Sequence, residues 1–412
     1  IGRQGREPFS YAHPCLDPIL ARTLGVPLFQ EQLLRVAMDG AGFTGGEAEE
    51  LRRAFGFKRS EARMKAIEVK LRQGLARNGI NGKTQDDIVL SISSFALYGF
   101  PESHAASFAL IAYASAYLKC NYLAAFTAAI LNNQPMGFYQ PFTIIKDAQR
   151  HGLKALPIDI TCSDWLCTLE KEEDGTLVLR LGLRYVRGLS QQSGEAIVRE
   201  RTAGGDFAGI DDLRNRVPEL RKDELRKLAA VGALNFIQNS SRRDALWQVE
   251  RVTRAAGKLY EELLEEDGNS PLQQMTLTER VDADFRGTGL TIGKHPVAHH
   301  RGELNKLDAL RAIDIRKLRN GTFVRVAGWV IVRQRPGTAK GFMFLSLEDE
   351  TGVSNIIVTP QLFDKYRREL VGHPFLLIEG ALQNQDNVIS VKASHVQPLS
   401  FTVAAAPSHD FH

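Results

Sequence analysis

The chain has 412 residues, 43% of them hydrophobic and 24% charged, with a formal net charge of +4 at pH 7. This length predicts about three domains of an ordinary globular protein. No run of 18 apolar residues occurs and no signal peptide opens the chain, so neither a membrane span nor secretion is predicted. A net charge this small does not by itself predict nucleic-acid binding. The first residue is Ile1 rather than Met, so we expect a fragment or a processed product.

The four cysteines show no C-x-x-C spacing: they are Cys15, Cys120, Cys162 and Cys167. This pattern indicates reduced thiols in the cytoplasm and argues against structural zinc. Three histidines lie close together in the sequence: His295, His299 and His300. No cysteine or carboxylate cluster joins them, so no metal site is predicted within this chain.

Residues 1–157 are predicted to form an all-helical block. Apolar residues from Phe29 to Met38 follow helical spacing, and Gly40 and Gly42 then end that helix. The first domain boundary is predicted near residue 157, where the helical pattern gives way to short strands.

The segment 51–77 carries nine basic residues and two acidic ones. One interpretation is a solvated helix face, which charged runs usually form. The other is a phosphate clamp. Adjacent arginines followed six residues later by Lys-Arg can present forked donors to a triphosphate or a DNA backbone. The candidates for such a clamp are Arg52, Arg53 and Lys58.

The stretch 97–122 is predicted to be a tight loop that leads into a long buried helix. Gly99 frees the backbone, and Pro101 suits the first helical turn. Ser103 and His104 then fall in that first turn, close to the loop. On the residues alone, a core helix with an ordinary cap remains an interpretation, since serine is a common cap.

Residues 158–258 change character. Short strands around an Asp174-Gly175 turn are predicted first, followed by two apolar–Gly–apolar hairpins at 186–189 and 231–234. In helix-hairpin-helix modules such a turn offers backbone N–H groups to a phosphate without reading bases. From residue 180 to 258 sixteen basic residues face ten acidic ones, which favours this interpretation over a small helical bundle with glycine caps. The candidate duplex contacts are Gly188, Gly232 and Arg187.

Residues 259–320 are acidic at first and then loop-like, as in a connector. Residues 321–400 are predicted to hold three strands, a short helix and two strands, the order of an OB-fold barrel. Such barrels carry single-stranded nucleic acid on aromatic and basic side chains, although Trp329 and Phe342 can equally belong to the barrel core. The candidate contacts are Trp329, Arg333, Arg335, Lys340 and Phe342. Residues 401–412 are predicted to be a disordered tail.

The segment GFPESHAASFALIAYASAYLK resembles the fingers helix of bacterial DNA polymerase III alpha subunits, which form polymerase family C. Its Pro-Glu before Ser-His is similar to the error-prone, damage-tolerant branch of that family. HPCLDPILARTLGVPLFQEQ, LRRAFGFKR and TIGKHPVAHHR resemble further family segments in the expected order, so the resemblance covers roughly residues 10–400. It implies the part of the alpha subunit from the fingers to the C-terminus, with a multidomain α+β fold. The implied domains are fingers (1–157), tandem helix-hairpin-helix module (158–258), connector (259–320) and OB-fold barrel (321–400).

The resemblance also implies roles for individual residues. Arg52, Arg53 and Lys58 match the fingers segment that contacts the phosphates of the incoming nucleotide. Ser103 and His104 match residues that lie beside the nucleotide's sugar. The paired hairpins of the family sit on duplex DNA behind the active site.

The full enzyme of the family adds deoxynucleotides to a primer by phosphoryl transfer, aided by a divalent metal (Mg) and palm carboxylates. Those aspartates precede the matched region, so the metal ligands are expected outside this chain. We therefore expect the nucleotide- and DNA-binding portion of an error-prone DNA polymerase used in translesion synthesis, DNA repair and damage-induced mutagenesis, inactive alone. Its expected partners are primer-template DNA and deoxynucleotide triphosphates. One alternative is a non-catalytic DNA-binding scaffold, which would ignore deoxynucleotide triphosphates. The other is a DNA ligase or nuclease fragment built from the same modules.

The interval NSPLQQMTLTERV resembles a sliding-clamp-binding peptide of the family. Gln274, Met275 and Leu277 match its Gln and two apolar positions, but Thr278 stands where an aromatic residue usually enters the clamp pocket. One buried aromatic often dominates a small interface, so its loss favours a degenerate site. The clamp is then expected to be reached through an accessory polymerase-like protein.

Overall fold

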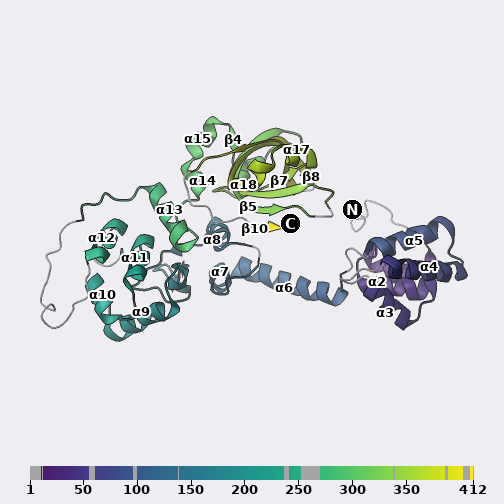
Figure 1. Cartoon of the computed structure of the whole chain (residues 1–412), viewed down its shortest axis with the longest axis horizontal. Helices are drawn as coiled ribbons and strands as arrows, with labels where there is room; N and C mark the ends of the chain where they lie inside the picture. Colours follow the sequence, from purple (N-terminus) through teal and green to yellow (C-terminus); the bar gives the residue numbers. More distant parts are fainter. Residues whose placement is uncertain are drawn as a thin grey trace. The chain divides into compact units, whose positions relative to one another are not determined.

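The computed structural model describes residues 11, 13–54, 61–95, 100–137, 139–235, 241–251, 270–336, 339–385, 388–401 and 409–411. The chain divides into two compact units, Ile1–Tyr117 and Leu118–His412 (Figure 1). Among the described residues, no helix has both the length and the apolar character needed to cross a bilayer.

The first unit is built from helices, as predicted. Its elements are η2 (Pro14–Leu16), α1 (Asp17–Leu20), η3 (Ala21–Thr23), α2 (Gln30–Arg35), the π-helical η4 (Val36–Gly40), α3 (Gly45–Ala54), α4 (Glu61–Arg77), α5 (Gly82–Phe95) and most of α6 (Glu102–Asn121). Their buried apolar side chains form one core. Helix α4 approaches the end of η4 closely because Gly74 has no side chain, and a Cβ there would lie 2.0 Å from the Ala41 carbonyl oxygen.

The buried amide of Gln32 fixes the loop before α2. Its Nε2 donates to the Ile19 carbonyl at 3.1 Å and to Thr23 Oγ1 at 2.8 Å. Its Oε1 accepts from the N–H groups of Leu28 and Phe29 at 2.9 and 3.1 Å. A buried side-chain amide destabilises a protein unless its polar groups are hydrogen-bonded. The four hydrogen bonds of Gln32 therefore hold the chain in one path as it enters α2.

The second unit begins with helices and a small sheet. After α7 (Leu123–Asn132) and α8 (Pro141–Arg150), the strands β1 (Ala155–Leu156), β2 (Thr168–Lys171) and β3 (Leu177–Arg180) pair in the order β1-β3-β2. Strands β2 and β3 are antiparallel, and Gly175 between them has φ +87°, which confirms the predicted turn at Asp174-Gly175.

A helical module follows. It comprises η5 (Leu183–Tyr185), α9 (Gln191–Gly204), α10 (Ile210–Arg216), α11 (Lys222–Val231), α12 (Arg242–Arg251) and α13 (Leu277–Thr288), with the short helices α14 (Pro296–His299) and α15 (Arg301–Lys306) after it. Both predicted glycine hairpins are turns here. The first lies between η5 and α9, and the second follows α11.

The C-terminal part is a closed barrel, which confirms the predicted OB-fold. Its elements are β4 (Ala309–Leu310), α16 (Ala312–Ile315), β5 (Phe323–Gln334), β6 (Met343–Glu348), β7 (Val353–Val358), α17 (Pro360–Lys365), α18 (Arg367–Gly372), β8 (Phe375–Gln385), β9 (Val388–Pro398) and β10 (His409–Phe411). Strand β5 pairs with both β6 and β8, β7 pairs in parallel with β9, and β8 pairs with β9, so the sheet closes.

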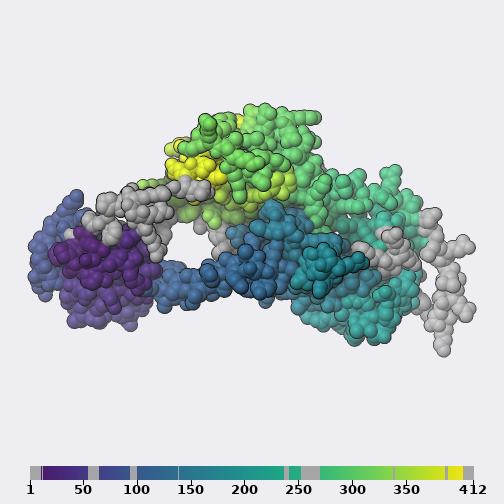
Figure 2. Space-filling view, turned by 180° about the vertical axis from the view of Figure 1, so that it is seen from behind, coloured from purple at the N-terminus to yellow at the C-terminus, as the bar shows by residue number. Residues whose placement is uncertain are grey.

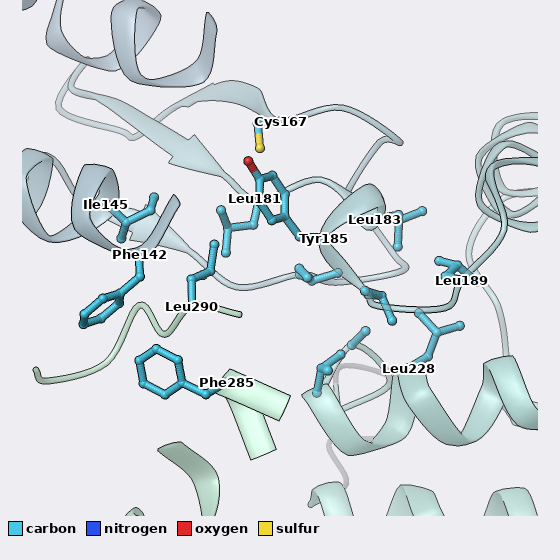
Figure 3. Close-up of a cluster of buried hydrophobic side chains, with 14 of the residues drawn as sticks. Phe142, Ile145, Cys167, Leu181, Leu183, Tyr185, Leu189, Leu228, Phe285 and Leu290 are labelled. Carbon is cyan, nitrogen blue, oxygen red and sulfur yellow. The ribbon is translucent and has the colours of Figure 1, made fainter. Parts of the chain in front are cut away.

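The barrel and the helical module share one aromatic core. The ring of Phe142 on α8 lies 4.9 Å from that of Phe285 on α13 and 5.0 Å from that of Trp329 on β5. Phe375 on β8 lies 5.2 Å from Trp329. Figure 3 shows Phe142 and Phe285 facing each other within this core. These contacts attach one end of the barrel to α8 and α13.

The tail differs from the predicted disorder where the structure describes it. Phe401 stacks on His300 with ring centroids 3.9 Å apart and planes 5° apart. Strand β10 adds to β5 in parallel. The physical reason is that the end of β5 offers unpaired backbone groups along its edge, which a short strand can satisfy. Residues 402–408 and 412 lie outside the described residues.

Candidate nucleotide and DNA-binding surfaces

The start of α6 is anchored on the start of α2. The Gln30 N–H donates to the Phe100 carbonyl at 3.2 Å, and a parallel bridge joins Phe29 to Phe100. The Glu31 carboxylate accepts the N–H of Glu102 at 2.9 Å, so an acid on α2 satisfies the exposed amide end of α6. The first turn of α6 is therefore held in place from outside the helix.

Ser103 and His104 both lie exposed in that first turn. The ring of His104 stands between two aromatic rings, 4.7 Å from Phe100 and 4.4 Å from Phe108. The Ser103 carbonyl accepts from Ser107 Oγ at 3.0 Å, an ordinary bond within the helix. Because Glu31 takes the first amide of the helix, the contacts of Ser103 give no support to the interpretation that it caps the helix.

Helix α6 does not match the predicted buried helix. No residue of α6 is buried, and large apolar side chains along it are exposed, Tyr113 to 77% and Leu110 to 73%. Figure 2 shows the blue segment that contains α6 at the surface on the face drawn. A helix that is apolar on all sides is normally buried. The apolar sequence of α6 predicts burial, and the exposure of its side chains differs from that prediction.

Arg52 and Arg53 lie exposed at the end of α3, as a clamp requires. Both guanidinium groups now bind Glu49: Arg52 donates through Nε and Nη2 at 2.8 and 2.7 Å, and Arg53 donates through Nε at 3.2 Å. The hydrogen bond from Arg52 lowers the pKa of Glu49 to about 2. A phosphate would have to replace this carboxylate. Lys58 lies outside the described residues.

Most backbone N–H groups of the first hairpin already donate to carbonyls within the protein. Val186, Arg187 and Leu189 donate their N–H groups to the carbonyls of Leu183, Gly287 and Val186 at 2.9, 2.7 and 3.1 Å. In the part of the chain that the structure describes, Gly188 is the one residue of this turn whose N–H has no protein acceptor. Gly188 has φ +78°, a conformation that favours glycine.

Two cations flank Gly188. Lys227 of α11 donates from Nζ to the Gly188 carbonyl at 3.1 Å. Arg187 is exposed, and its Nη1 donates to the Phe285 carbonyl at the end of α13 at 3.2 Å. Lys227 was not among the predicted contacts. No local pattern could have identified it, because 39 residues separate it from Gly188.

The second hairpin is a helix cap. Gly232 ends α11 with φ +86°, and the N–H groups of Gly232 and Ala233 donate to the carbonyls of Ala229 and Leu228 at 3.0 and 2.9 Å. Arg242 lies against Gly232, so that a Cβ there would come within 2.7 Å of its Nε. The amides of these two residues are therefore occupied, which agrees with the alternative interpretation of a glycine cap.

Two of the predicted single-strand contacts in the barrel are buried, and their assignment is corrected. Trp329 is 2% exposed and packs in the aromatic core, because α8 and α13 cover that end of the barrel. Arg333 is 7% exposed, and its Nε and Nη2 each donate to a backbone carbonyl, of Leu370 and His373, at 2.7 Å. These two side chains stabilise the barrel and its helices and are not presented to a ligand.

The other three candidates lie near the tip between β5 and β6. Arg335 and Lys340 are exposed, and Phe342 is half-buried. The Arg335 guanidinium lies 4.1 Å from the centre of the Phe363 ring, a cation–π contact that leaves donors free to bind a phosphate.

Phe344 is a further exposed aromatic that the prediction missed. In β6 the residues Met343, Leu345 and Leu347 are buried, while Phe344 between them is 37% exposed. It pairs with Gln334 on β5 and Ile357 on β7. Period-two alternation in the sequence would have placed Phe344 on the outward face.

The clamp-like segment is exposed. Gln274 and Leu277 are exposed and Met275 is half-buried, just before and at the start of α13. Thr276 caps α13 and accepts the Glu279 N–H at 3.3 Å, while Glu279 accepts the Thr276 N–H at 2.7 Å. This capping box fixes the start of α13 shortly after the exposed Gln274.

The histidine motif has a structural role at His295. Its Nδ1 accepts the Val297 N–H at 3.2 Å, and its Nε2 lies 3.8 Å from the buried Glu348 carboxylate on the barrel. Within the described ranges, no three His, Cys, Asp or Glu side chains come together as metal ligands.

Comparisons with known proteins cover every part of the chain. A family described as the bacterial DNA polymerase III alpha subunit finger domain matches residues 1–79. A helix-hairpin-helix motif matches residues 152–245, and an OB-fold nucleic acid binding domain matches residues 324–399.

Curated relatives match the chain from end to end. An error-prone DNA polymerase of Anaeromyxobacter sp. (strain K) is 44% identical over 418 residues, which covers 100% of this chain and 37% of the relative. Error-prone DNA polymerase 2 of Agrobacterium fabrum (strain C58 / ATCC 33970) is 40% identical over 420 residues, which covers 99% of this chain and 38% of the relative. The chain thus spans less than two fifths of the length of these relatives. With its fingers, hairpin and OB-fold matches in the same order, the chain belongs to the bacterial DNA polymerase III alpha subunits, on the error-prone branch of that family.

Proposed function

We propose that this chain is the nucleotide- and DNA-binding portion of an error-prone DNA polymerase that acts in translesion synthesis in the cytoplasm. The observation that carries the proposal is the set of exposed cations and aromatics on three modules of one chain. They are the Arg52–Arg53 pair, the cations around Gly188, and the outward groups of the barrel. Whole-chain relatives named as error-prone DNA polymerases support the same function.

The fingers side binds the incoming deoxynucleotide triphosphate in this proposal. Arg52 and Arg53 exchange the Glu49 carboxylate for triphosphate oxygens, because forked guanidinium groups bind both anions with the same geometry. Lys58 adds a further charge. Ser103 and His104 lie against the sugar, and a hydroxyl at the 2′ position would meet their side chains. The divalent metal that supports phosphoryl transfer is held by carboxylates outside this chain.

The second unit holds DNA. Duplex phosphates meet Lys227, Arg187 and the free N–H of Gly188, while the turn at Gly232 orients its neighbours. A single strand crosses the barrel over Arg335, Lys340, Phe342 and Phe344, where bases can stack and phosphates can bind. Both contacts are independent of base sequence, which suits a polymerase.

Two further partners complete the proposal. The rest of the polymerase polypeptide covers the apolar helix α6. The sliding clamp is engaged mainly through an accessory polymerase-like protein, because Thr278 replaces the aromatic anchor in the segment with Gln274, Met275 and Leu277.

Ligand binding by the chain tests the proposal. A DNA-binding scaffold with the same modules would bind duplex and single-stranded DNA but not nucleotides. We expect the chain to bind a deoxynucleotide triphosphate in a fluorescence titration with primer-template present, and to bind less after Arg52→Ala with Arg53→Ala. We also expect duplex affinity to fall steeply with salt, because phosphate contacts release counterions. Binding to DNA without any nucleotide binding would favour the scaffold.

A further inference from the structure

Glu224 is a carboxylate buried between the start of α9 and the start of α11. Its side chain has no solvent exposure. Oε1 accepts the Ser190 N–H at 2.8 Å, and Oε2 accepts from Ser193 Oγ at 2.9 Å and from the Arg221 N–H at 3.0 Å. Ser190 follows the first hairpin directly and caps α9. One carboxylate therefore joins the exit of the first hairpin to the helix that ends in the second.

Lys227 extends this link to the turn itself. It lies three residues after Glu224 on α11, and its Nζ donates to the Gly188 carbonyl at 3.1 Å and to Asp223 at 3.2 Å. A Cβ on Gly188 would lie 2.6 Å from that Nζ. Figure 3 shows Leu189 of the hairpin near Leu228 of α11 in the core below. The position of the ammonium group thus depends on how α11 is held against the hairpin.

The carboxylate also decides where a phosphate can bind. It occupies the start of α9 and takes the Ser190 N–H, so this amide is not available to an anion. Within the described residues of the turn, the Gly188 N–H remains open and the Lys227 ammonium lies beside it. An anion that approaches the turn therefore meets the Gly188 amide and two cations, Lys227 and Arg187.

We propose that Glu224 is a positioning residue for duplex binding that acts through Lys227. It holds α11 against the first hairpin, so that Lys227 and the Gly188 N–H present a single phosphate site. This inference rests on the proposed duplex binding by the hairpin module. A residue that only stabilises the fold would leave phosphate contacts unchanged in the molecules that remain folded.

The test compares two variants that each remove one negative charge, Glu224→Gln and Glu250→Gln. Glu250 is an exposed acid on α12 that pairs with Arg226 and Lys222. Long-range electrostatics predicts that both variants bind a short DNA duplex as tightly as the native chain or more tightly. If Glu224 positions Lys227, Glu224→Gln instead binds more weakly. Its plot of log affinity against log salt becomes shallower by about 0.9, the loss of one phosphate contact. An unchanged slope in folded Glu224→Gln contradicts the positioning role.

A double-mutant cycle shows whether Glu224 acts through Lys227. We expect Glu224→Gln in a Lys227→Met background to cause no further loss of duplex affinity. Additive losses would show that Glu224 acts independently of Lys227 and would contradict the proposal. If Glu224→Gln does not fold at the assay temperature, Ser193→Ala removes one donor to the carboxylate instead. That variant should shift the slope in the same direction, and an unchanged slope there is equally contradictory.

The native chain separates this inference from the function on which it rests. If native duplex binding is insensitive to salt, the proposed duplex binding itself is contradicted. If the native slope is steep and Glu224→Gln shares it, only the positioning role fails.

Discussion

The guanidinium of Arg150 donates to the carboxylate of Glu348 at 2.8 Å, and the side chain of Glu348 is completely buried. Arg150 ends α8, and Glu348 ends β6. This ion pair lies beside the ring of His295, whose Nε2 is 3.8 Å from the other carboxylate oxygen. Together with the aromatic core around Trp329, it connects the OB-fold barrel to the helices before the hairpin module.

Breaking this pair on one side should destabilise the second unit strongly. Arg150→Met leaves the buried Glu348 without its cation, and we expect a loss of about 3–5 kcal/mol in the free energy of unfolding. Arg325→Met is the control, because Arg325 binds Glu379 at a partly exposed site and should lose less than about 1 kcal/mol. Urea unfolding measures both. Equal small losses would show that the buried pair does not stabilise the junction.

Glu224 should make stability dependent on pH in the acid range. Burial raises the pKa of Glu224, but hydrogen bonds from Arg221, Ser190 and Ser193 lower it more, to about 2. Its folded pKa is depressed from 4.5, so its contribution is complete above pH 4.5 and is lost as the pH falls toward 2. The free-energy difference between the native chain and Glu224→Gln should therefore shrink by about 3 kcal/mol between pH 6 and pH 2. A difference that stays constant over that range contradicts this pKa.

Lys146 should make the free energy of unfolding depend on pH in the alkaline range. Burial lowers its pKa to about 8, although the charges of Glu348 and Asp284 oppose the shift and that of Arg150 adds to it. Its Nζ donates to Gln149 Oε1 at 2.8 Å and to the Gly293 carbonyl. Between pH 8 and 10.5 the unfolded chain binds more protons than the folded one, so stability rises with pH there.

Lys146→Met isolates this effect, because other groups titrate in both proteins. We expect the stability of the native chain relative to the variant to rise by up to about 3 kcal/mol between pH 7 and pH 10.5. Chemical unfolding at a series of pH values measures it. A relative stability that is flat or falls with pH contradicts the lowered pKa.

Gly74 should tolerate no side chain. A Cβ at this position would lie 2.0 Å from the Ala41 carbonyl oxygen, which is backbone and cannot move alone. We expect Gly74→Ala to lose more than about 2 kcal/mol of stability, as overpacked sites do. Gly46→Ala is the matched control on α3, because a Cβ there meets nothing within 4 Å. It should be neutral or slightly stabilising, since alanine favours helix over glycine. Similar thermal midpoints for both variants would contradict the close approach of α4.

Local sequence patterns predicted the elements that depend on local rules. Helical spacing, the Asp174-Gly175 turn, the glycine hairpins and the strand order of the barrel follow from periodicity and turn chemistry. The side-chain roles that failed depend on tertiary contacts instead. Trp329 and Arg333 both lie in β5, which reads in the sequence as an ordinary strand. Nothing local in the sequence shows that α8 covers Trp329 and that α18 covers Arg333.

The sequence predicted exposed arginines at Arg52 and Arg53, but it predicted a buried helix after Ser103 and His104, and it could not predict partners that are distant in the chain. Arg52, Arg53, Ser103 and His104 are exposed, as a ligand site needs. Their partners could not be predicted in the same way. Glu31 caps α6 from 71 residues away, and Lys227 reaches Gly188 across 39 residues. Contacts of this kind arise only when separate helices pack.

The proposed nucleotide contact by Arg52 and Arg53 is tested most directly in a polymerase that contains this chain together with its palm. Arg52→Ala with Arg53→Ala should weaken the apparent affinity for the incoming nucleotide by about tenfold or more, because two charge-assisted bonds to phosphate are lost. Primer-template affinity should change little. Arg77→Ala, an exposed cation at the end of α4, is the control and should alter neither. An unchanged nucleotide affinity in the double variant would contradict the proposed role of this chain in nucleotide binding.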